Sequence, residues 1–331
     1  SKFSKSLASD VGAKFPVFIA DIEGIGKVDF ALARRENRRG DTRRDFEVQT
    51  LGVSIEDDLR RRDLTVNAIA VNMLTGDKVD PFGGESDLLD GIAREVSPAF
   101  AEDSLRIFRA ARFAARFGLK PSDSLIRTCK SLTTGDISNE RVGMEFVKAM
   151  KQAERPSAFF RFLSEVGHLE PHFSELAALI GVEQDPIHHP EGDAFEHTMQ
   201  TLDQAEGAFM RTVMACHDLG KATTTALNKH GRIGAIGHEK AGVPLAKAML
   251  GRISAFDKAT IRRMCVLIEL HMIHAQTISE KGIRKALRRL MDAGLEFGDL
   301  VEVCRCDVSG RGDLPKHTPD IGQARAAELV A

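Results

Sequence analysis

Short apolar runs alternate with glycine-containing turns in the first part of the chain. Apolar runs at 15–20 and 28–33 flank a turn at 23–26, and runs at 69–73 and 78–80 flank a second turn at 74–77. Apolar runs joined by such turns are typical of β-hairpins. The pattern therefore predicts an α/β region over residues 1–97.

The apolar period becomes helical from Ala101 onward. A helix is expected to end at Gly118, and its apolar face combines Leu105, Phe108, Ala111 and Ala115. Ser138 is expected to cap a further helix. Later helical stretches are predicted at 157–166, at 174–180 and from 194 to the end of the chain.

A stretch rich in His and Pro at 185–190 is typical of a linker. It divides the helical part into a neck and body at 98–185 and a last domain at 186–331. The chain opens on Ser1 rather than Met, and residues 323–331 resemble a helix cut in mid-run. We therefore expect a chain that is trimmed at both ends.

Composition narrows the class of protein. Of the 331 residues, 43% are hydrophobic and 28% charged, as in ordinary globular proteins. The sequence has no apolar run of membrane-spanning length and opens on no signal peptide. Five cysteines without a C-x-x-C pair favour reduced thiols and a cytoplasmic protein. The net charge of −2 means that any RNA contact must come from local basic clusters.

Four charged motifs follow one another along the chain. Arg61-Arg62-Asp63 precedes Asn67, and guanidinium groups pair with phosphates in bidentate geometry. For any single arginine, a solvated helix end is the simpler interpretation. Residues 80–84, with the sequence DPFGG, are followed by Asp87. Paired glycines permit a tight turn and a close backbone approach.

The third motif is Glu102-Asp103-x-x-Arg106, with Arg109 and Arg112 at helical spacing. An Asp and an Arg one turn apart can present acceptors and donors to the edge of a base. A salt bridge on a solvated helix face is the alternative. The fourth motif runs over residues 140–145, with the sequence ERVGME, and would also serve as a helix ion pair.

The four motifs in this order resemble the bacterial CCA-adding enzymes and their poly(A) polymerase relatives, over about residues 14–173. The resemblance implies an α+β fold. A polymerase-β-like nucleotidyltransferase head with a mixed sheet, here without its first strands, would precede an all-α neck and body. The implied activity is addition of C, C and A to the tRNA acceptor end from CTP and ATP without a nucleic-acid template.

The resemblance also implies roles for single residues. The motif at 61–67 would bind nucleotide through Arg62, Asp63 and Asn67. Asp103 and Arg106 would pair with the Watson–Crick edge of CTP or ATP. Arg62 would hold the triphosphate together with Arg109 and Arg112.

One departure from the family is important. Its members open with a Gly-Gly-x-x-Arg-Asp loop and an Asp-x-Asp strand, whose aspartates hold Mg²⁺. Neither motif occurs before Phe15 in this chain. Asp29 is the candidate for the third carboxylate of such a site. We therefore expect weak nucleotide binding and little transfer, most simply through truncation, with a split gene or a lost activity as alternatives.

An arginine-rich stretch at 34–44 also carries acidic residues. It contains Arg34, Arg35, Arg38, Arg39, Arg43 and Arg44. A solvated loop and a flexible loop near the tRNA acceptor end are equally consistent with this pattern.

The last domain contains histidines and aspartates in a pattern suited to metal binding. His197 precedes the pair His217-Asp218, Lys221 follows one turn later, and the series continues with His238, His271 and Asp307. Imidazole and carboxylate ligands on neighbouring helices suit a hydrolytic divalent metal. Such a metal turns water into a nucleophile near neutral pH. His188, His189 and His230 are expected to be solvated loop residues.

This series resembles the HD phosphohydrolase superfamily, and most closely the tail of multifunctional CCA-adding enzymes. The resemblance implies an all-α HD domain with the metal ligands His197, His217, Asp218 and Asp307. His217, Asp218 and Lys221 would be catalytic. Lys221, His238, His271 and Arg311 would contact phosphate or a second metal. The implied activities are 2′,3′-cyclic phosphodiesterase, 2′-nucleotidase and phosphatase, with Ni²⁺, Mg²⁺ or Mn²⁺.

Three other functions stay open at this point. The chain could be a hydrolase alone, an RNA-binding subunit without nucleotidyl transfer of its own, or a bacterial poly(A) polymerase. A homodimer through the HD domain is a further possibility.

Overall fold

The structure is a computed structural model that describes residues 17–38, 46–275, 279–312 and 314. The chain divides into two units, the first ending at Arg106 and the second beginning at Ile107. The expected boundary after residue 97 lies close to this division.

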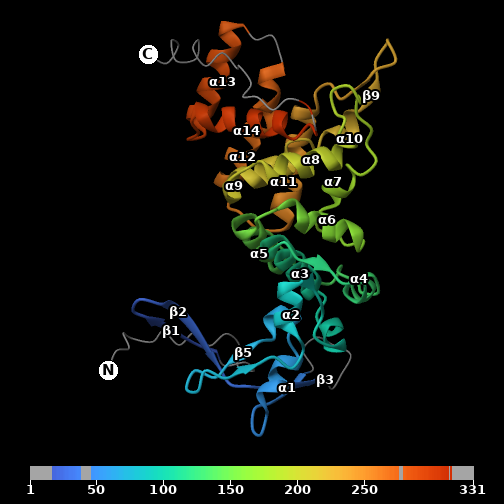
Figure 1. The fold of residues 1–331 in the computed structure, drawn as a ribbon. Helices are drawn as coiled ribbons and strands as arrows, with labels where there is room; N and C mark the ends of the chain where they lie inside the picture. Colours follow the sequence, from blue (N-terminus) through green and yellow to red (C-terminus); the bar gives the residue numbers. More distant parts are fainter. Residues whose placement is uncertain (1–16, 39–45, 276–278, 313, 315–331) are drawn as a thin grey trace. The chain divides into compact units, whose positions relative to one another are not determined.

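The first unit consists of short strands and short helices (Figure 1). Its elements are β1 (Val17–Ile22), β2 (Gly26–Ala31), β3 (Arg35–Arg38), β4 (Phe46–Gln49), α1 (Ile55–Arg60), η1 (Thr65–Asn67), β5 (Ala70–Val71), β6 (Lys78–Val79), α2 (Gly84–Leu89), β7 (Ile92–Ala93) and η2 (Pro98–Glu102).

Both predicted hairpins form. In β1–β2 the register runs from Val17 opposite Ala31 to Ile22 opposite Gly26. The turn between them contains Gly24 with φ 80°, a left-handed conformation that glycine adopts without strain. β5 and β6 form the second hairpin, shorter than predicted.

Within the described residues, the strand pairs β1–β2, β3–β4 and β5–β6 are all antiparallel and two-stranded. The two strands of each pair are consecutive in the chain. Their antiparallel orientation follows from this, because a short connection can join only antiparallel strands.

The arginine-rich stretch is not simply a loop. Arg35 begins β3, where it pairs with Gln49 of β4 and its guanidinium lies 2.5 Å from Asp57. A backbone ladder therefore orders part of this stretch. Arg39, Arg43 and Arg44 lie outside the described residues.

Helices make up most of the second unit, which α3 (Leu105–Phe117) enters from the first. Its other elements are β8 (Lys120–Pro121), α4 (Asp123–Lys130), α5 (Asn139–Gln152), α6 (Ser157–Glu165), α7 (Ser174–Ala177), α8 (Ala194–Asp203), α9 (Gly207–Cys216), α10 (Lys221–Thr224), β9 (Ala226–Leu227), β10 (Ile233–Gly234), α11 (His238–Arg252), α12 (Lys258–Leu270), η3 (His271–Ala275), α13 (Glu280–Asp292) and α14 (Phe297–Ser309).

Several helix ends follow local sequence rules. Gly118 ends α3 with φ 65°, as predicted. Ser138 occupies the N-cap position of α5, although its side chain makes no capping hydrogen bond. Asp193 caps α8 by accepting a hydrogen bond from the Glu196 backbone N–H at 2.8 Å. This cap fixes the start of the helix that carries His197.

Phenylalanines form the centre of one part of the core. The Phe146 ring on α5 lies 5.7–6.4 Å, centroid to centroid, from the rings of Phe159, Phe160, Phe173 and Phe256. Tilted and edge-on pairs at such distances are favourable beyond the area they bury. Gly143 lets α5 approach the end of α11, since a Cβ there would lie 2.0 Å from the Ile253 carbonyl oxygen.

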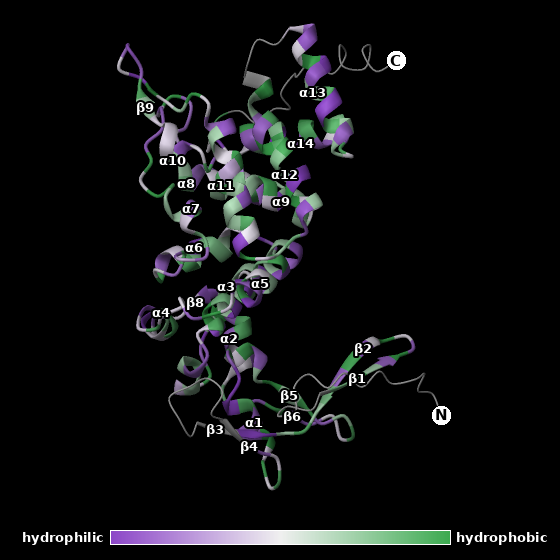
Figure 2. Ribbon diagram, turned by 180° about the vertical axis from the view of Figure 1, so that it is seen from behind, coloured by the Kyte–Doolittle hydropathy of each residue, from purple (hydrophilic) through white to green (hydrophobic). Residues whose placement is uncertain are grey.

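A second part of the core lies among α8, α9, α12 and α14, which pack against one another. Figure 2 shows hydrophobic residues gathered on α12 and α14 and hydrophilic residues prominent on α13. α11 packs along α12 and brings its first residue, His238, to the same region. The metal-ligand candidates therefore lie on or directly beside helices that pack together.

Contacts cross the expected boundary between residues 185 and 186. Asp203 of α8 accepts hydrogen bonds from the backbone N–H and the hydroxyl of Ser157, at 2.9 and 2.7 Å. Arg161 of α6 forms a bidentate ion pair with Glu196. The division of the helical part into two domains stays a prediction.

All five cysteines are free and buried, in line with the missing pair spacing. Among the residues that the structure describes, no helix combines the length and apolar character needed to cross a membrane.

Candidate functional site

Asp218 lies at the centre of a buried cluster of histidines. It follows His217 at the end of α9 and precedes α10, and only 1% of it is exposed. Asp218 Oδ2 lies 3.2 Å from His217 Nε2 and 2.6 Å from Lys221 Nζ. Asp218 Oδ1 lies 3.1 Å from His238 Nε2 and 3.6 Å from His271 Nε2. The structure thus brings five predicted residues to one point.

Two further ligand candidates join this cluster from other helices. His197 of α8 places Nε2 3.0 Å from Asp307 Oδ1 on α14 and 3.5 Å from Asp218 Oδ2. Arg311, just beyond α14, places Nη2 3.4 Å from Asp307 Oδ2. Gly310 permits this approach, because a Cβ there would lie 2.3 Å from Thr201 Cγ2 on α8.

The backbone orients three of the imidazole rings. The Nδ1 atom of each ring lies close to a backbone carbonyl oxygen. The distance is 2.7 Å from His217 to Met214, 2.7 Å from His271 to Ile268 and 2.6 Å from His238 to Ala235. A carbonyl oxygen only accepts, so Nδ1 must carry the proton and donate it. In the neutral ring Nε2 then keeps its lone pair, which is the form that binds metals.

The residues present fit a divalent metal ion. His217 Nε2 and Asp218 Oδ2 are buried and lie 3.2 Å apart, and because the Nδ1 of His217 carries the ring proton, the two atoms face each other as acceptors. The ligand atoms of His197, His217 and Asp218 lie within 4.8 Å of one another, and so do those of Asp218, His238 and His271. Two buried acceptors that face each other are costly, and a shared cation would satisfy both.

Charge keeps both carboxylates ionised. Burial alone would raise the pKa of Asp218, but His217 and Lys221 hold it well below its ordinary value. Burial likewise opposes ionisation of Asp307, and the hydrogen bond from His197 outweighs it, so that its pKa is also well below the ordinary value. Both groups are therefore available as anionic ligands near neutral pH.

Glu191 was missed by sequence reasoning. Its buried Oε1 lies 2.6 Å from His197 Nδ1 and 2.8 Å from His189 Nδ1. Burial works against its ionisation, but the hydrogen bonds from His189 and His197 lower the pKa of Glu191 to about 2. This carboxylate accepts from His197 Nδ1 and turns Nε2 toward Asp307, a common arrangement behind histidine ligands.

His189 is therefore not the solvated loop residue that we predicted. Its partner Glu191 holds it in a half-buried position against the His197 ring, with ring centroids 4.7 Å apart. A carboxylate six residues before a candidate ligand was the only signal in the sequence.

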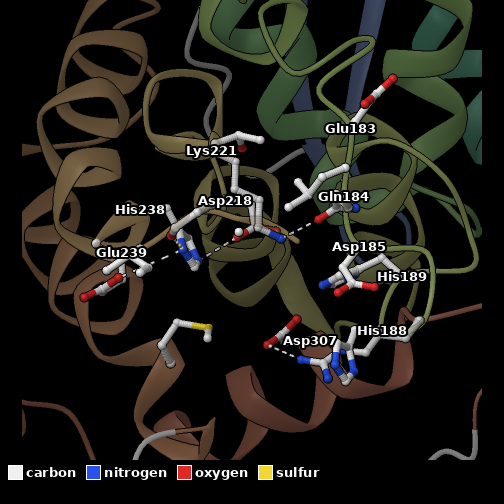
Figure 3. Close-up of a pocket in the computed structure, with 18 of the residues that line it drawn as sticks. Glu183, Gln184, Asp185, His188, His189, Asp218, Lys221, His238, Glu239 and Asp307 are labelled. Carbon is white, nitrogen blue, oxygen red and sulfur yellow. Dashed lines mark hydrogen bonds and ion pairs between the residues drawn. The ribbon is translucent and has the colours of Figure 1, made fainter. Parts of the chain in front are cut away.

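The cluster opens into a cavity of about 480 Å³. Figure 3 shows Asp218 and Lys221 between the loop residues Glu183 to His189 on one side and His238 with Glu239 on the other. Asp307 and Arg311 also line the cavity. Lys221 Nζ donates to Gln184 Oε1 at 2.7 Å, which fixes the ammonium at the cavity wall.

The first of the four charged motifs, at residues 61–67, forms one hydrogen-bonded loop in the first unit. Asn67 Nδ2 donates to Asp63 Oδ1 at 3.1 Å, and Arg62 Nη1 donates to the Asn67 carbonyl oxygen at 3.0 Å. Asp63 is buried and Arg62 is exposed. The structure thus brings the three predicted residues together and leaves the arginine at the surface.

The glycine motif that follows has a structural role. The carboxylate of Asp80 accepts from the backbone N–H groups of Gly84 and Glu85, at 2.8 and 2.9 Å, and so caps α2. A Cβ at Gly84 would lie 2.1 Å from the Thr65 carbonyl oxygen, so only glycine fits there.

Asp103 and Arg106 lie where η2 ends and α3 begins. Asp103 Oδ1 accepts from the Leu105 backbone N–H at 3.1 Å. Arg106 donates to the carbonyl oxygens of Ala99 and Arg61, both at 2.6 Å. The guanidinium therefore ties parts of the first unit together, and its pairing with a base stays a prediction.

Arg109 and Arg112 lie on α3 in the second unit. Arg109 is half-buried and lies 5.8 Å from the Phe113 ring centroid. Arg112 is only 5% exposed, and its Nε lies 2.5 Å from Glu145 Oε2 on α5. The fourth motif thus supplies a buried counter-charge, which favours a structural role for Arg112 over the predicted phosphate contact.

Asp29 lies exposed on β2, opposite Ile19 of β1. Among the described residues it belongs to no group of possible metal ligands. Its role as a third carboxylate stays a prediction.

Comparison with known proteins identifies the family. Residues 3–94 match the poly A polymerase head domain. The multifunctional CCA protein of Laribacter hongkongensis is 37% identical over 326 residues, which cover 94% of this chain and 77% of that protein. The corresponding protein of Nitrosococcus oceani is 36% identical over 335 residues, covering 97% of this chain and 80% of that protein.

Solved structures show the same fold. The CCA-adding enzyme of Bacillus stearothermophilus in complex with CTP covers 99% of this chain and 70% of its own, with a TM-score of 0.61 at 19% identity. The match to the Thermotoga maritima CCA-adding enzyme complexed with tRNA covers 99% of this chain and 68% of that enzyme, with a TM-score of 0.55 at 17% identity. The expected fold of a polymerase-β-like head followed by helices is therefore confirmed. On the sequence similarity over nearly its whole length, the chain belongs to the family of multifunctional CCA proteins.

Proposed function

We propose that the second unit is a metal-dependent phosphohydrolase that acts on phosphate esters at the 3′ end of tRNA. The observation that supports this most is the pair of buried acceptor atoms, His217 Nε2 and Asp218 Oδ2, which face each other at 3.2 Å. They lie beside Lys221, in a cluster that opens into a cavity large enough for a nucleotide. Similarity to CCA-adding enzymes, one of which was solved in complex with tRNA, supports the choice of substrate.

The proposed metal ligands are His197, His217, Asp218 and Asp307. A divalent ion supplies Lewis-acid activation of a phosphoryl group and a nucleophilic water near neutral pH. Among nickel, magnesium and manganese, imidazole ligands favour nickel over magnesium.

The remaining residues of the site would act on the phosphate. Lys221 and Arg311 bring positive charge to the cavity and would neutralise phosphoryl oxygens. His238 and His271 place their Nε2 atoms 3.1 Å apart and next to Asp218. We propose that these two imidazoles contact phosphate or hold a second metal ion.

The test is release of phosphate from adenosine 2′-phosphate and opening of adenosine 2′,3′-cyclic phosphate, with Ni²⁺, Mn²⁺ or Mg²⁺ added to metal-free protein. We expect metal-dependent turnover that Asp218→Ala reduces to background. His230→Gln is the matched control, since His230 is an exposed histidine of the same unit. Turnover that survives Asp218→Ala, or that needs no metal, would reject the proposal.

We propose as a second function the addition of C, C and A from CTP and ATP with Mg²⁺, supported by the family and by the hydrogen-bonded loop at Arg62 and Asn67. The test uses tRNA that lacks CCA, with CTP, ATP and Mg²⁺.

Incorporation of both nucleotides, reduced by Arg62→Ala, would support CCA addition. Incorporation of ATP alone into many RNAs would favour a poly(A) polymerase. If nothing is incorporated while phosphate release persists, the chain is a hydrolase alone. If both activities are absent and the tRNA still binds, the chain is an RNA-binding subunit.

A further inference from the structure

One wall of the cavity is apolar, and phosphate chemistry does not use it. Besides the charged residues around Asp218, the cavity is lined by Thr225 and by residues 233–237, whose side chains include Ile233, Ala235 and Ile236. A phosphate group alone occupies only a small part of about 480 Å³. The wall therefore has room for a larger, less polar part of a substrate.

The wall is a built element of the fold. β9 and β10 form a hairpin with Ile233 opposite Leu227 and Gly234 opposite Ala226. The Asn228 side chain closes its turn, with Oδ1 accepting from the His230 and Arg232 backbone N–H groups at 2.8 and 3.1 Å. The position of the wall is therefore set by its own backbone and turn.

Ile236 is the exposed part of this wall. It is 91% exposed, among the most exposed large hydrophobic residues described in the chain, and it lines the cavity all the same. A large apolar side chain at the rim of a cavity gains most when a ligand covers it.

The wall is directly connected to the charged cluster. The Ala235 carbonyl oxygen accepts from His238 Nδ1 at 2.6 Å, and Gly237, with φ 82°, begins the helix that carries His238. His238 Nε2 in turn lies 3.1 Å from Asp218 Oδ1. The hydrogen bond between Ala235 and His238 thus links the wall to the cluster around Asp218.

We propose that Ile233, Ala235 and Ile236 bind the terminal nucleoside of the substrate, and this inference rests on the proposed phosphohydrolase function. The site would then select nucleoside phosphates over simple phosphate esters. Among the residues that the structure describes, no aromatic ring other than histidine lines the cavity, and the sequence contains no Trp or Tyr. Aliphatic side chains contact the face of a base and form no hydrogen bonds with its edge. Adenosine and cytidine phosphates would therefore be hydrolysed with similar KM values.

The test compares two secondary phosphate esters, adenosine 2′-phosphate and glycerol 2-phosphate, which has no base. In Ile236→Ser the KM for adenosine 2′-phosphate should rise about fivefold, the loss expected when half of an isoleucine side chain is no longer covered. Its kcat and the KM for glycerol 2-phosphate should stay unchanged. Leu227→Ser is the matched control, because Leu227 is 69% exposed on the same hairpin and does not line the cavity.

Equal KM values in Ile236→Ser and the unaltered protein would overturn the inference, and so would equal rises for both esters. Binding of adenosine, measured by saturation-transfer NMR, separates this inference from the catalytic proposal. Adenosine should bind the unaltered protein and Leu227→Ser, and more weakly Ile236→Ser. If adenosine binds in this way while no ester is hydrolysed, only the proposed function fails. If adenosine does not bind, the nucleoside wall is wrong whatever the turnover.

Discussion

Gly220 is the position where a single methyl group should disturb the cluster most. It lies between Asp218 and Lys221, and a Cβ there would lie 2.1 Å from the His238 carbonyl oxygen and 2.7 Å from the Gly242 backbone nitrogen. Both obstacles are backbone atoms of α11, so no side chain can turn away. Gly220→Ala must therefore push α10 and α11 apart by about 1 Å in a close-packed interior.

The expected cost of this overpacking is about 3 kcal/mol, the upper part of the usual range. For a unit of this size, that is a fall in Tm of roughly 6–12 °C. The movement also separates His217 and Asp218 from His238, so divalent metal should bind more weakly. Thermal unfolding followed by circular dichroism, with and without metal, measures both effects.

Gly251→Ala is the matched control. Gly251 lies near the end of α11, and a Cβ there meets no atom within 4 Å. This change should be neutral or stabilising by about 0.5–1 kcal/mol, the difference in helix propensity. An unchanged Tm in Gly220→Ala, or equal losses in both variants, would refute the reasoning.

Two ion pairs yield further predictions. Glu145→Ala leaves the buried guanidinium of Arg112 without its counter-charge and should lower the free energy of unfolding, measured by chemical denaturation, by about 3–5 kcal/mol. Replacing both residues by Leu and Met should recover much of this stability. Equal losses of stability in the single and double variants would contradict the prediction. Burial works to raise the pKa of Glu196, but the bidentate pair with Arg161 lowers it overall. The pair therefore stabilises the fold fully above the unfolded pKa near 4.5, by on the order of 1 kcal/mol after solvent screening, and loses this as the pH falls. The difference in Tm between the unaltered protein and Glu196→Gln should shrink from pH 7 to pH 4, and a constant difference would be evidence against the pair.

Local features of the fold could be predicted from the sequence. The hairpin turn with Gly24 and the helix end at Gly118 depend on residues close together in the chain, so a short window contains the cause. That the antiparallel pairs are separate and two-stranded could not be predicted, because strand pairing depends on contacts outside any short window of sequence. For the same reason the arginine-rich stretch around Arg35 was not expected to pair with β4.

The cluster could be predicted in its residue types but not in its geometry. His197 and Asp307 lie 110 positions apart in sequence and meet only because α8 packs against α14. Which ring nitrogen faces the centre depends on carbonyl oxygens such as that of Met214, which no sequence pattern reveals. Glu191 was missed because its role depends on contacts with two histidines.

The most direct test of the proposed metal centre is the number of divalent ions bound by the full chain, measured by equilibrium dialysis against Ni²⁺ or Mn²⁺ and elemental analysis. We predict about one ion or more per chain for the unaltered protein and for His230→Gln, and a clear loss for His197→Ala and Asp307→Ala, with circular dichroism confirming that each variant is folded. Absence of bound metal in the unaltered protein would contradict the proposed metal centre. So would folded His197→Ala and Asp307→Ala variants that bind as much metal as the unaltered protein.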